Sequence, residues 1–376
     1  MAAPELTKLW ILLDRLANGG LERVQVNIAT ELKQRNIDVS IVAGKVTPHY
    51  GSSKAINFPI IELSPRSKLL FPYYLIKKIY VDRPSHIMTT SNDVACMLIV
   101  INFFLSEKID ITVSHHLSIS EPIRRAKRFK RIKLKMVVNL MRILYPYAQN
   151  IVAVSNGVAD DLSYTSRTDR KRIATIYNPI VSRTFASKIS EGVIEQSSFK
   201  NSLPTVIFVG RICSVKRIDI ILAAIEKVIL KTPVDLLIVG DGPDINDLEK
   251  QIREKCLQEF CVLTGFVENP LPLIAASDVL VLTSDYEGFG NVLVEAMACG
   301  TQVISTKCPY GPEEILGNNL FGQLIPTNDS DALVSAILNV VEGRFLVEKS
   351  VLKSRAMDFS VELAVSKYLD IFEKRI

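Results

Sequence analysis

Short apolar runs alternate along the chain with longer stretches that carry apolar residues at helical spacing. In the first half, helical stretches separate most of the runs, and the runs are apolar throughout rather than at every second residue. This pattern is typical of buried parallel strands joined by crossover helices. The runs cover 8–14, 39–44, 86–91, 109–114 and 150–155, and the clearest helical stretches cover 21–34, 67–81 and 93–107.

The second half repeats this order after a polar stretch at 187–202 that lacks periodicity. We therefore predict an α/β fold with two doubly wound Rossmann-like domains facing a cleft, and a ligand in that cleft. The apolar runs of this half lie near 205–210, 235–240, 261–266, 278–283 and 302–306. The predicted parts are a first domain at 1–185, a linker at 186–203, a second domain at 204–360 and a last helical segment at 361–376.

Composition narrows the class of protein only slightly. With 376 residues, of which 48% are hydrophobic, the chain is long enough for two domains with sizeable cores. The net charge of +5 is modest, and six cysteines without a C-x-x-C pair favour reduced, mostly core thiols in a cytosolic protein. The start lacks the basic region of a signal peptide. The apolar segment 94–105 is shorter than the roughly 20 residues of a spanning helix, so we expect a buried helix there.

The most informative motif is a glycine-rich loop and helix at 284–300 that carries the acids Glu287 and Glu295. Gly288 and Gly290 permit backbone angles that other residues avoid, and a helix beginning near Asn291 presents unpaired N–H groups that attract an anion. Carboxylates beside an anion site are favourable where they accept hydrogen bonds from neutral hydroxyls, so the motif predicts a ligand that joins phosphate to polyol. A nucleotide sugar fits this description. The alternative is a solvated loop acid and an ordinary first-turn helix acid.

A second motif, at 205–219, predicts a buried strand that ends at Gly210, a loop with two cations, and an apolar helix over 218–230. Arg211 offers a planar fork and Lys216 a point charge, and together they suit a diphosphate. Basic residues in such a loop are often merely solvated. Their place before the acidic motif favours the diphosphate interpretation.

Two histidines end the predicted strand at 109–114, where parallel sheets present ligand-binding groups. Because side chains alternate along a strand, His115 and His116 point in opposite directions if the strand continues through them. We expect one of the two to face the ligand, and the alternative is a hydrogen-bonded structural histidine. Metal ligation is disfavoured because no second cluster of ligands accompanies them in the sequence.

Paired glycines lie at Gly19 and Gly20, before the helical stretch at 21–34. They either form a tight turn or let the N–H groups at the start of the helix approach a ligand. Neither this pair nor the segment 240–243 has the third glycine of a dinucleotide fingerprint, so NAD binding is disfavoured.

A basic amphipathic segment follows the histidines and is compatible with one helix after Pro122. The cations Arg124, Arg128, Arg131 and Lys135 recur at helical spacing, with apolar residues between them. A solvated face is one interpretation, and nucleic-acid binding lacks the aromatic residues that stack on bases. Contact with anionic lipid headgroups or with an acceptor diphosphate is the interpretation we favour.

Together these motifs resemble the retaining GT-B glycosyltransferases of family four. The segments 209–211 with Lys216, 237–243, 264–266 and 287–295 occur in the order and approximate spacing of that family, and 19–23 is similar to its first strand–helix turn. The similarity runs from about residue 9 to the C-terminus. It implies a GT-B fold whose final helix crosses back to the first domain.

The resemblance also implies roles for individual residues. His116, or otherwise His115, would lie beside the transferred sugar, and Glu287 would hold the sugar hydroxyls. Arg211 and Lys216 would bind the diphosphate, and Glu295 would accept from the ribose. The remaining donor-binding residues would be Gly19, Gly20, Gly288, Phe289, Gly290, Asn291 and Val292.

The expected function is retaining transfer of a hexose or N-acetylhexosamine from a nucleotide diphosphate sugar to a growing, lipid-linked glycan. The segment 308–314 resembles that of family members that use UDP-sugars. We expect no metal cofactor, no nucleic-acid partner, and a cytoplasmic enzyme peripheral to the inner face of a bacterial cell membrane, in surface polysaccharide or oligosaccharide assembly. The alternatives are a nucleotide-sugar epimerase of the same fold and a non-catalytic protein that binds membranes or nucleic acid.

Overall fold

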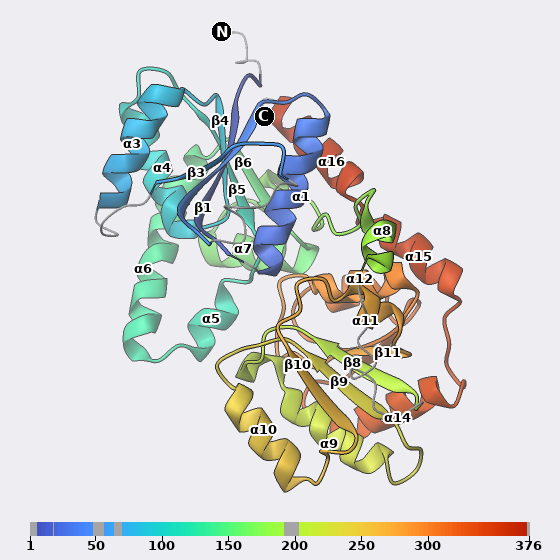
Figure 1. Ribbon diagram of the computed structural model, residues 1–376. Helices are drawn as coiled ribbons and strands as arrows, with labels where there is room; N and C mark the ends of the chain where they lie inside the picture. The colour runs from blue at the N-terminus through green and yellow to red at the C-terminus, as the bar shows by residue number, and fades with distance from the viewer. Residues whose placement is uncertain (1–5, 18, 48–55, 64–69, 192–202, 374–376) are drawn as a thin grey trace. The chain divides into compact units, whose positions relative to one another are not determined.

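The computed structural model describes residues 6–17, 19–47, 56–63, 70–191 and 203–373. The chain forms two compact units, the first comprising Met1–Pro179 with Val361–Ile376 and the second Ile180–Ser360. Each unit contains one parallel sheet covered by helices, which confirms the predicted α/β class and doubly wound architecture (Figure 1). The chain therefore crosses between the units twice, once after Pro179 and once after Ser360.

The sheet of the first unit has seven strands in the order β3-β2-β1-β4-β5-β6-β7. Its centre is buried on both faces, as expected for a sheet between helices: β4 is buried throughout, and β1 is buried except at Asp14 and Arg15. The strands are β1 (Leu9–Leu16), β2 (Val39–Val46), β3 (Ile60–Glu62), β4 (His86–Thr89), β5 (Asp110–His115), β6 (Asn150–Ala153) and β7 (Ile173–Thr175).

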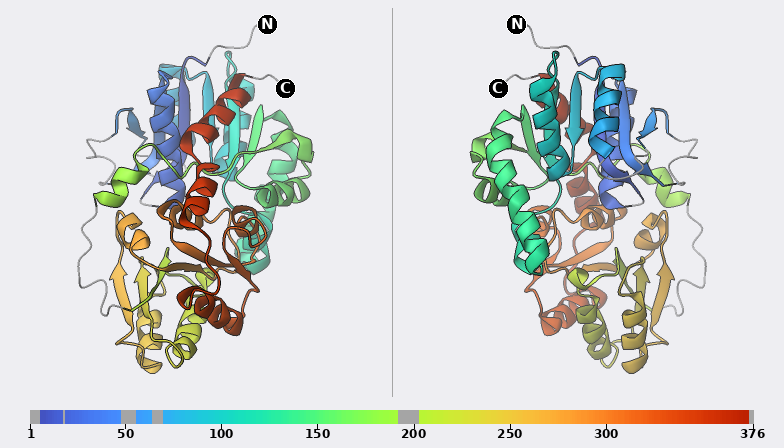
Figure 2. Two further views of the ribbon diagram at one scale, coloured as in Figure 1. Left: turned by 90° about the vertical axis from the view of Figure 1, so that its right-hand side faces the viewer. Right: turned by 90° about the vertical axis from the view of Figure 1, so that its left-hand side faces the viewer.

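The helices of the first unit include the C-terminal one, α16 (Val361–Glu373), which packs beside α1 (Gly20–Gln34) (Figure 2). Arg35, which follows α1, donates to the Ser366 hydroxyl and to the Glu362 carbonyl of α16. The others are α3 (Phe71–Asp82), α4 (Asn92–Phe104), α5 (Ser120–Arg125), α6 (Arg128–Leu144) and α7 (Asn156–Ser166), with short 3-10 turns η2 (Tyr145–Tyr147) and η3 (Arg170–Arg172).

The second unit has six parallel strands in the order β10-β9-β8-β11-β12-β13. They are β8 (Thr205–Val209), β9 (Asp235–Val239), β10 (Cys261–Gly265), β11 (Val279–Leu282), β12 (Gln302–Thr306) and β13 (Gln323–Ile325). The helices are α8 (Phe185–Ser190), η5 (Ser214–Lys216), α9 (Ile218–Val228), α10 (Ile245–Glu254), α11 (Leu271–Ala275), α12 (Asn291–Cys299), α13 (Pro312–Leu316), α14 (Ser330–Val341) and α15 (Lys349–Met357). All of helix α8 except Phe185 falls in the predicted linker, as do residues 192–202, which lie outside the described residues.

Both sheets contain a topological switch point, where the strand order reverses and ligands bind beyond the carboxyl ends of the strands. In the first unit β1 lies beside β4, and β4 beside β5, so the loops after these strands share one edge. In the second unit β8 lies beside β11. The loop that follows β8 and the glycine-rich loop that follows β11 are therefore neighbours, although about 70 residues separate them.

Two predictions about helices are wrong in part. The basic segment is not one helix, because Ala126 and Lys127 have extended backbone angles that end α5 and precede α6. Helix α4, expected to be buried, is buried only over its first half, since Phe103 is 50% exposed and Phe104 82% exposed. Of the six cysteines, which are all free, Cys96, Cys261 and Cys308 are buried.

Candidate functional site

The neighbouring loops of the second unit bring Lys216 and Glu287 together. Nζ of Lys216 lies 2.6 Å from Oε1 of Glu287, and the side chains are 21% and 12% exposed. The Ser284 hydroxyl donates to the same carboxylate oxygen at 2.6 Å. The hydroxyl of Thr283 donates to the backbone carbonyl of Lys216 at 2.9 Å and so holds the backbone of this loop in place. The sequence predicted both charged residues for this site, and the ion pair between them was not anticipated.

Burial controls the electrostatics around this ion pair. It lowers the pKa of Lys216, but the Glu287 carboxylate and its hydrogen bond outweigh that effect, so the pKa lies above its ordinary value and the ammonium stays charged. Burial also raises the pKa of the Cys308 thiol to about 12, and the charge of Glu287 adds to the rise. The pair is therefore mostly buried, and its hydrogen bonds are stronger than those of exposed groups.

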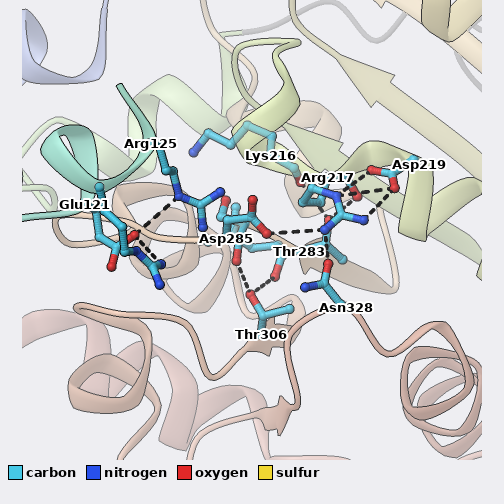
Figure 3. A network of polar contacts seen from close by, with 12 residues as sticks. Glu121, Arg125, Lys216, Arg217, Asp219, Thr283, Asp285, Thr306 and Asn328 are labelled. Atoms are coloured by element: carbon cyan, nitrogen blue, oxygen red, sulfur yellow. Dashed lines mark hydrogen bonds and ion pairs between the residues drawn. The ribbon is translucent and has the colours of Figure 1, made fainter. Parts of the chain in front are cut away.

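Arg217, which the sequence analysis overlooked, anchors the same loop. Its guanidinium donates to Asp219 at 2.8 Å and to Asp285 at 3.3 Å, and it also bonds the side chain of Asn328. Figure 3 shows Arg217 lying between the two carboxylates. These bonds tie the loop after β8 to the loop after β11. Arg217 has a left-handed conformation (φ +51°) that starts α9, and nothing in the spacing of the motif distinguished it from Lys216.

Arg211 differs from the other cations of this loop. It is exposed and has no ion pair with any residue in the described ranges. A planar guanidinium that no carboxylate occupies can bind a phosphate of a ligand. Of the two predicted diphosphate partners, Lys216 is therefore paired with Glu287, whereas Arg211 is available to a ligand.

The glycine-rich loop leads into α12 as predicted. Gly290 precedes the helix with φ +103° and makes no side-chain cap hydrogen bond, and the start of the helix carries the positive end of its dipole. Asn291, Val292 and Glu295 on α12 are half-buried. Phe289 is different: its side chain is buried and packs edge to face on Phe359 at 5.5 Å between ring centroids, so only its backbone is available to a donor.

A close backbone approach holds this loop in place. Gly311 has φ +94°, and a Cβ at that position would overlap the carbonyl of Phe289. The N–H of Glu287 donates to the Pro309 carbonyl at 2.7 Å, and the N–H of Tyr310 donates back to Glu287 at 3.3 Å. The segment 308–314 thus supports the glycine-rich loop from the next strand of the sheet.

In the first unit both histidines are buried where β5 ends. His115 is 2% exposed and lies against Tyr145 at 5.6 Å between ring centroids, and its Nε2 has no hydrogen-bond partner in the part of the chain that is described. His116 is 8% exposed, and its Nε2 lies 3.1 Å from Nε2 of Gln25 and 3.1 Å from Oγ of Ser114. His116 is therefore firmly oriented, and Gln25 and Ser114 were not anticipated from the sequence.

Both imidazoles are neutral at physiological pH. Burial lowers the pKa of His115 to about 3, and the neighbouring His116 contributes to the decrease. Burial likewise lowers the pKa of His116 to about 4, and the nearby Asn178 side chain opposes the decrease. Neither group is suited to general-base catalysis near pH 7, because that role needs a pKa near the working pH. Their remaining role is to hydrogen-bond a neutral group.

The two histidines line a cavity of about 220 Å³ within the first unit. Its polar lining includes Ser118, whose buried hydroxyl has no partner among the described residues, and its apolar lining comes largely from α5 and α6. None of the lining residues is charged. They are Leu21, Thr90, Asn92, His115, His116, Leu117, Ser118, Ile119, Pro122, Ile123, Leu134, Val137, Val138 and Met141.

The glycine pair starts α1, as predicted from the sequence. Gly19 precedes the helix and Gly20 is its first residue, and no side chain caps this end. A Cβ on Gly19 would overlap the carboxylate of Glu22, whose pKa is raised by burial. Glycine at position 19 thus leaves room for the Glu22 carboxylate, which bonds its own backbone N–H at the start of α1.

The four cations predicted to contact a membrane or acceptor lie on two helices. Arg124, on α5, pairs with Glu121 at 2.7 Å. Arg131, on α6, donates to the carbonyls of Ile123 and Arg124 at 3.2 and 3.1 Å and so braces one helix on the other. Arg128 and Lys135 are exposed on α6 and form no ion pair within the described ranges.

Within the ranges described above, no helix is both long and apolar enough to cross a membrane. The same ranges contain no group of three or more His, Cys, Asp or Glu side chains arranged to hold a metal ion.

Comparison with known protein families matches both units. Residues 18–182 match the family model described as Glycosyltransferase Family 4, and residues 203–343 match the one described as Glycosyl transferases group 1.

Two curated relatives align over nearly their whole length. An N-acetylgalactosamine-N,N'-diacetylbacillosaminyl-diphospho-undecaprenol 4-alpha-N-acetylgalactosaminyltransferase of Campylobacter jejuni is 26% identical, over 94% of this chain and 96% of its own. The amylovoran biosynthesis glycosyltransferase AmsD of Erwinia amylovora is 25% identical, over 97% and 99%. Among solved structures, Anabaena HepE in complex with UDP-glucose superposes with a TM-score of 0.79 at 20% identity, over 96% of this chain and 99% of that one, and so has the same fold.

Proposed function

Because this chain belongs to the family 4, group 1 glycosyltransferases, we propose that it moves a hexose or N-acetylhexosamine from a UDP-sugar to a lipid-linked glycan, with retention of anomeric configuration. The reaction serves bacterial surface polysaccharide or oligosaccharide assembly, and the Erwinia relative is named for the biosynthesis of amylovoran. The single observation that carries the donor site is the Lys216–Glu287 pair, formed where the loops of β8 and β11 meet.

Charge complementarity supports a nucleotide diphosphate at this pair. Lys216, the guanidinium of Arg211 and the N-terminal end of α12 offer positive charge to the two phosphates. The Glu287 carboxylate repels phosphate but accepts hydrogen bonds from neutral hydroxyls, so we assign it to the hydroxyls of the donor sugar. Glu295 would accept hydrogen bonds from the ribose hydroxyls in the same way. Because protein groups meet the diphosphate charge, transfer proceeds without a divalent metal.

The chemistry follows from this arrangement. The bond between the anomeric carbon and the diphosphate oxygen breaks, and the cations stabilise the negative charge that develops on the leaving group. The acceptor hydroxyl forms the new bond on the face that the diphosphate leaves, so the configuration is retained. The hydroxyl proton passes to the departing diphosphate, so a histidine of low pKa need not take it. His116, or His115, donates a hydrogen bond to a sugar oxygen.

We propose that the acceptor binds to the first unit. The cavity beside the histidines has no charged lining, so it suits an uncharged sugar and not a phosphate. The name of the Campylobacter relative describes an acceptor sugar on diphospho-undecaprenol, which supports a lipid-linked acceptor here. The cations of α5 and α6 adjoin the cavity and are suited to a lipid diphosphate or to anionic headgroups.

The surface of helix α6 supports the proposal that this protein binds to the inner face of the cell membrane. An exposed apolar stripe recurs along it every three or four residues, with Phe129 at 88% exposed and Met136 at 63%. Its other members are Ile132, Leu140 and Ile143. Cations flank the stripe on both sides, among them Arg128, Lys133 and Lys135. An apolar stripe between cations is typical of a helix that lies in the interface of an anionic bilayer.

The donor assignment is tested by separating the two acids kinetically. Glu295→Ala removes binding shared by the ground and transition states, so it should mainly raise the KM for the UDP-sugar, whereas Glu287→Ala should mainly lower kcat. Unchanged parameters in either variant would remove that acid from the site.

UDP should raise the Tm of the wild type more than other nucleoside diphosphates do. If the protein converted a UDP-sugar to its epimer in the absence of an acceptor, the proposed function would be wrong and the protein would be an epimerase.

The membrane assignment is tested by co-sedimentation with liposomes. Changing Arg124, Arg128, Arg131 and Lys135 together to Gln should abolish binding to anionic liposomes, at about 1 kcal/mol per residue near the surface, and lower transfer to a lipid-linked acceptor. Slow hydrolysis of the donor should persist in this variant, because Lys216, Glu287 and Glu295 lie in the second unit and none of the four cations is assigned to the donor. A matched control replaces exposed cations of α10, Lys250 and Arg253, by Gln. If both variants bound anionic liposomes equally well, the cations of α5 and α6 would be a solvated face with no role in membrane binding.

A further inference from the structure

A chain of hydrogen bonds connects the C-terminal helix to His116. The hydroxyl of Tyr368 on α16 lies 3.1 Å from Oγ of Ser114 on β5, and that Oγ lies 3.1 Å from Nε2 of His116. Nε2 of Gln25, on α1, lies 3.1 Å from the same ring nitrogen. All four side chains are at most 8% exposed. The chain therefore joins three elements far apart in the sequence, and bulk water does not compete for its bonds.

The donors and acceptors of this chain fix the position of the ring proton. With the amide nitrogen of Gln25 facing the ring, as the structure places it, Nε2 of His116 accepts and the neutral ring carries its proton on Nδ1. The Ser114 hydroxyl also donates to Nε2, and its oxygen accepts the proton of Tyr368. Burial raises the pKa of Tyr368 to about 12, partly offset by the bond to Ser114, so this hydroxyl keeps its proton at neutral pH.

We infer that Tyr368 is a positioning residue that acts through Ser114 to hold the His116 imidazole in one orientation as its Nδ1–H tautomer. The C-terminal segment that returns to the first unit thus completes the surroundings of the histidine as well as packing on α1. With Nε2 occupied by two donors, His116 can only donate from the other ring nitrogen. The kinetic part of this inference rests on the proposed function, whereas the tautomer does not.

The central test removes one oxygen atom. Tyr368→Phe keeps the ring that lies 6.0 Å from Phe372 but takes away the proton that Ser114 accepts. Gln25 alone then holds Nε2 as an acceptor while Ser114 can accept from the ring, so nitrogen NMR of the labelled imidazole should show the Nε2–H tautomer beside the Nδ1–H one. We expect kcat to fall about two- to tenfold, the effect of losing one neutral buried hydrogen bond, with the KM for the nucleotide sugar little changed.

A double-mutant cycle tests whether Tyr368 acts through Ser114. Ser114→Ala should produce the same mixture of tautomers, and adding Tyr368→Phe should cause no further fall in kcat, because the path is already broken. Ser166→Ala is the matched control. Ser166 is a buried residue of the same unit whose hydroxyl bonds Leu162 and Thr168, so its loss should lower stability and leave the His116 tautomer and kcat unchanged.

Three results would overturn the inference: a proton on Nε2 of His116 in the wild type, a Tyr368→Phe variant with unaltered His116 signals, and additive losses in the cycle. The NMR measurement needs no turnover, so its outcome is separate from that of the transfer assays.

Discussion

Replacing Lys216 by Ala separates two roles of the Lys216–Glu287 pair. The change removes an ammonium 2.6 Å from the Glu287 carboxylate and leaves that carboxylate with the Ser284 hydroxyl. The folded protein loses the ion pair, and the transition state loses a counter-charge to the leaving diphosphate. Unfolding measurements report the first loss, and transfer kinetics report the second.

The expected magnitudes follow from burial. Truncating one partner of a fully buried pair costs about 3–5 kcal/mol. Lys216 is 21% exposed and Glu287 12%, so water still reaches both. We expect the free energy of unfolding to fall by about 1–3 kcal/mol. Losing one preorganised electrostatic group costs ~2–4 kcal/mol of transition-state stabilisation, which corresponds to a fall in kcat/KM of roughly 30- to 1000-fold.

The assay compares this variant with Lys227→Ala in the same unit. Lys227 also pairs at 2.6 Å, with Asp331, but the two side chains are 47% and 82% exposed. Removing such an exposed pair costs about 0–1 kcal/mol of stability, and kcat/KM should not change. Urea unfolding and steady-state transfer would be measured for both variants. A Lys216→Ala protein that is less stable yet transfers at the wild-type rate would refute the diphosphate role and leave the pair purely structural.

Two further predictions concern stability. The unfolded chain binds protons at a histidine pKa near 6.5, whereas the folded values of His115 and His116 are about 3 and about 4, so stability should fall as pH drops from 6.5 toward 4. The slope in urea unfolding should reach about 1.4 kcal/mol per pH unit for each histidine, and an unchanged slope after His115→Gln would contradict this. Gly311→Ala should lower the Tm far more than Gly343→Ala, because both glycines have positive φ but only the first would overlap a backbone carbonyl, that of Phe289. Equal losses would contradict the close approach.

The sequence predicted those parts of the fold that hydrophobic patterning dictates. Long buried runs gave the central strands of both sheets, and the order of strands and helices gave the two doubly wound units. The strands β3, β7 and β13 were not anticipated, because three residues are too few to show a pattern. The break between α5 and α6 was not anticipated either, since Ala126 and Lys127 are both compatible with a helix.

At the site, sequence reasoning found residues but not their contacts. Glycines and charges after predicted strands pointed to Lys216 and Glu287, because parallel strands present their loops at one edge. The partners of His116 could not be found in this way. Tyr368 and Gln25 reach it from helices whose packing depends on the whole unit, and each looks like an ordinary amphipathic position in sequence.

The central claim is retaining transfer of a sugar from a UDP-sugar, and one measurement tests it most directly. The protein would be incubated with UDP-linked hexoses and N-acetylhexosamines and a lipid diphosphate-linked acceptor in the presence of EDTA, and the new glycosidic bond would be examined by proton NMR. We predict transfer of an α-linked sugar from an α-linked donor at a rate that the chelator does not change. A β-linked product, or transfer that stops on chelation and returns with manganese or magnesium, would contradict the proposed mechanism.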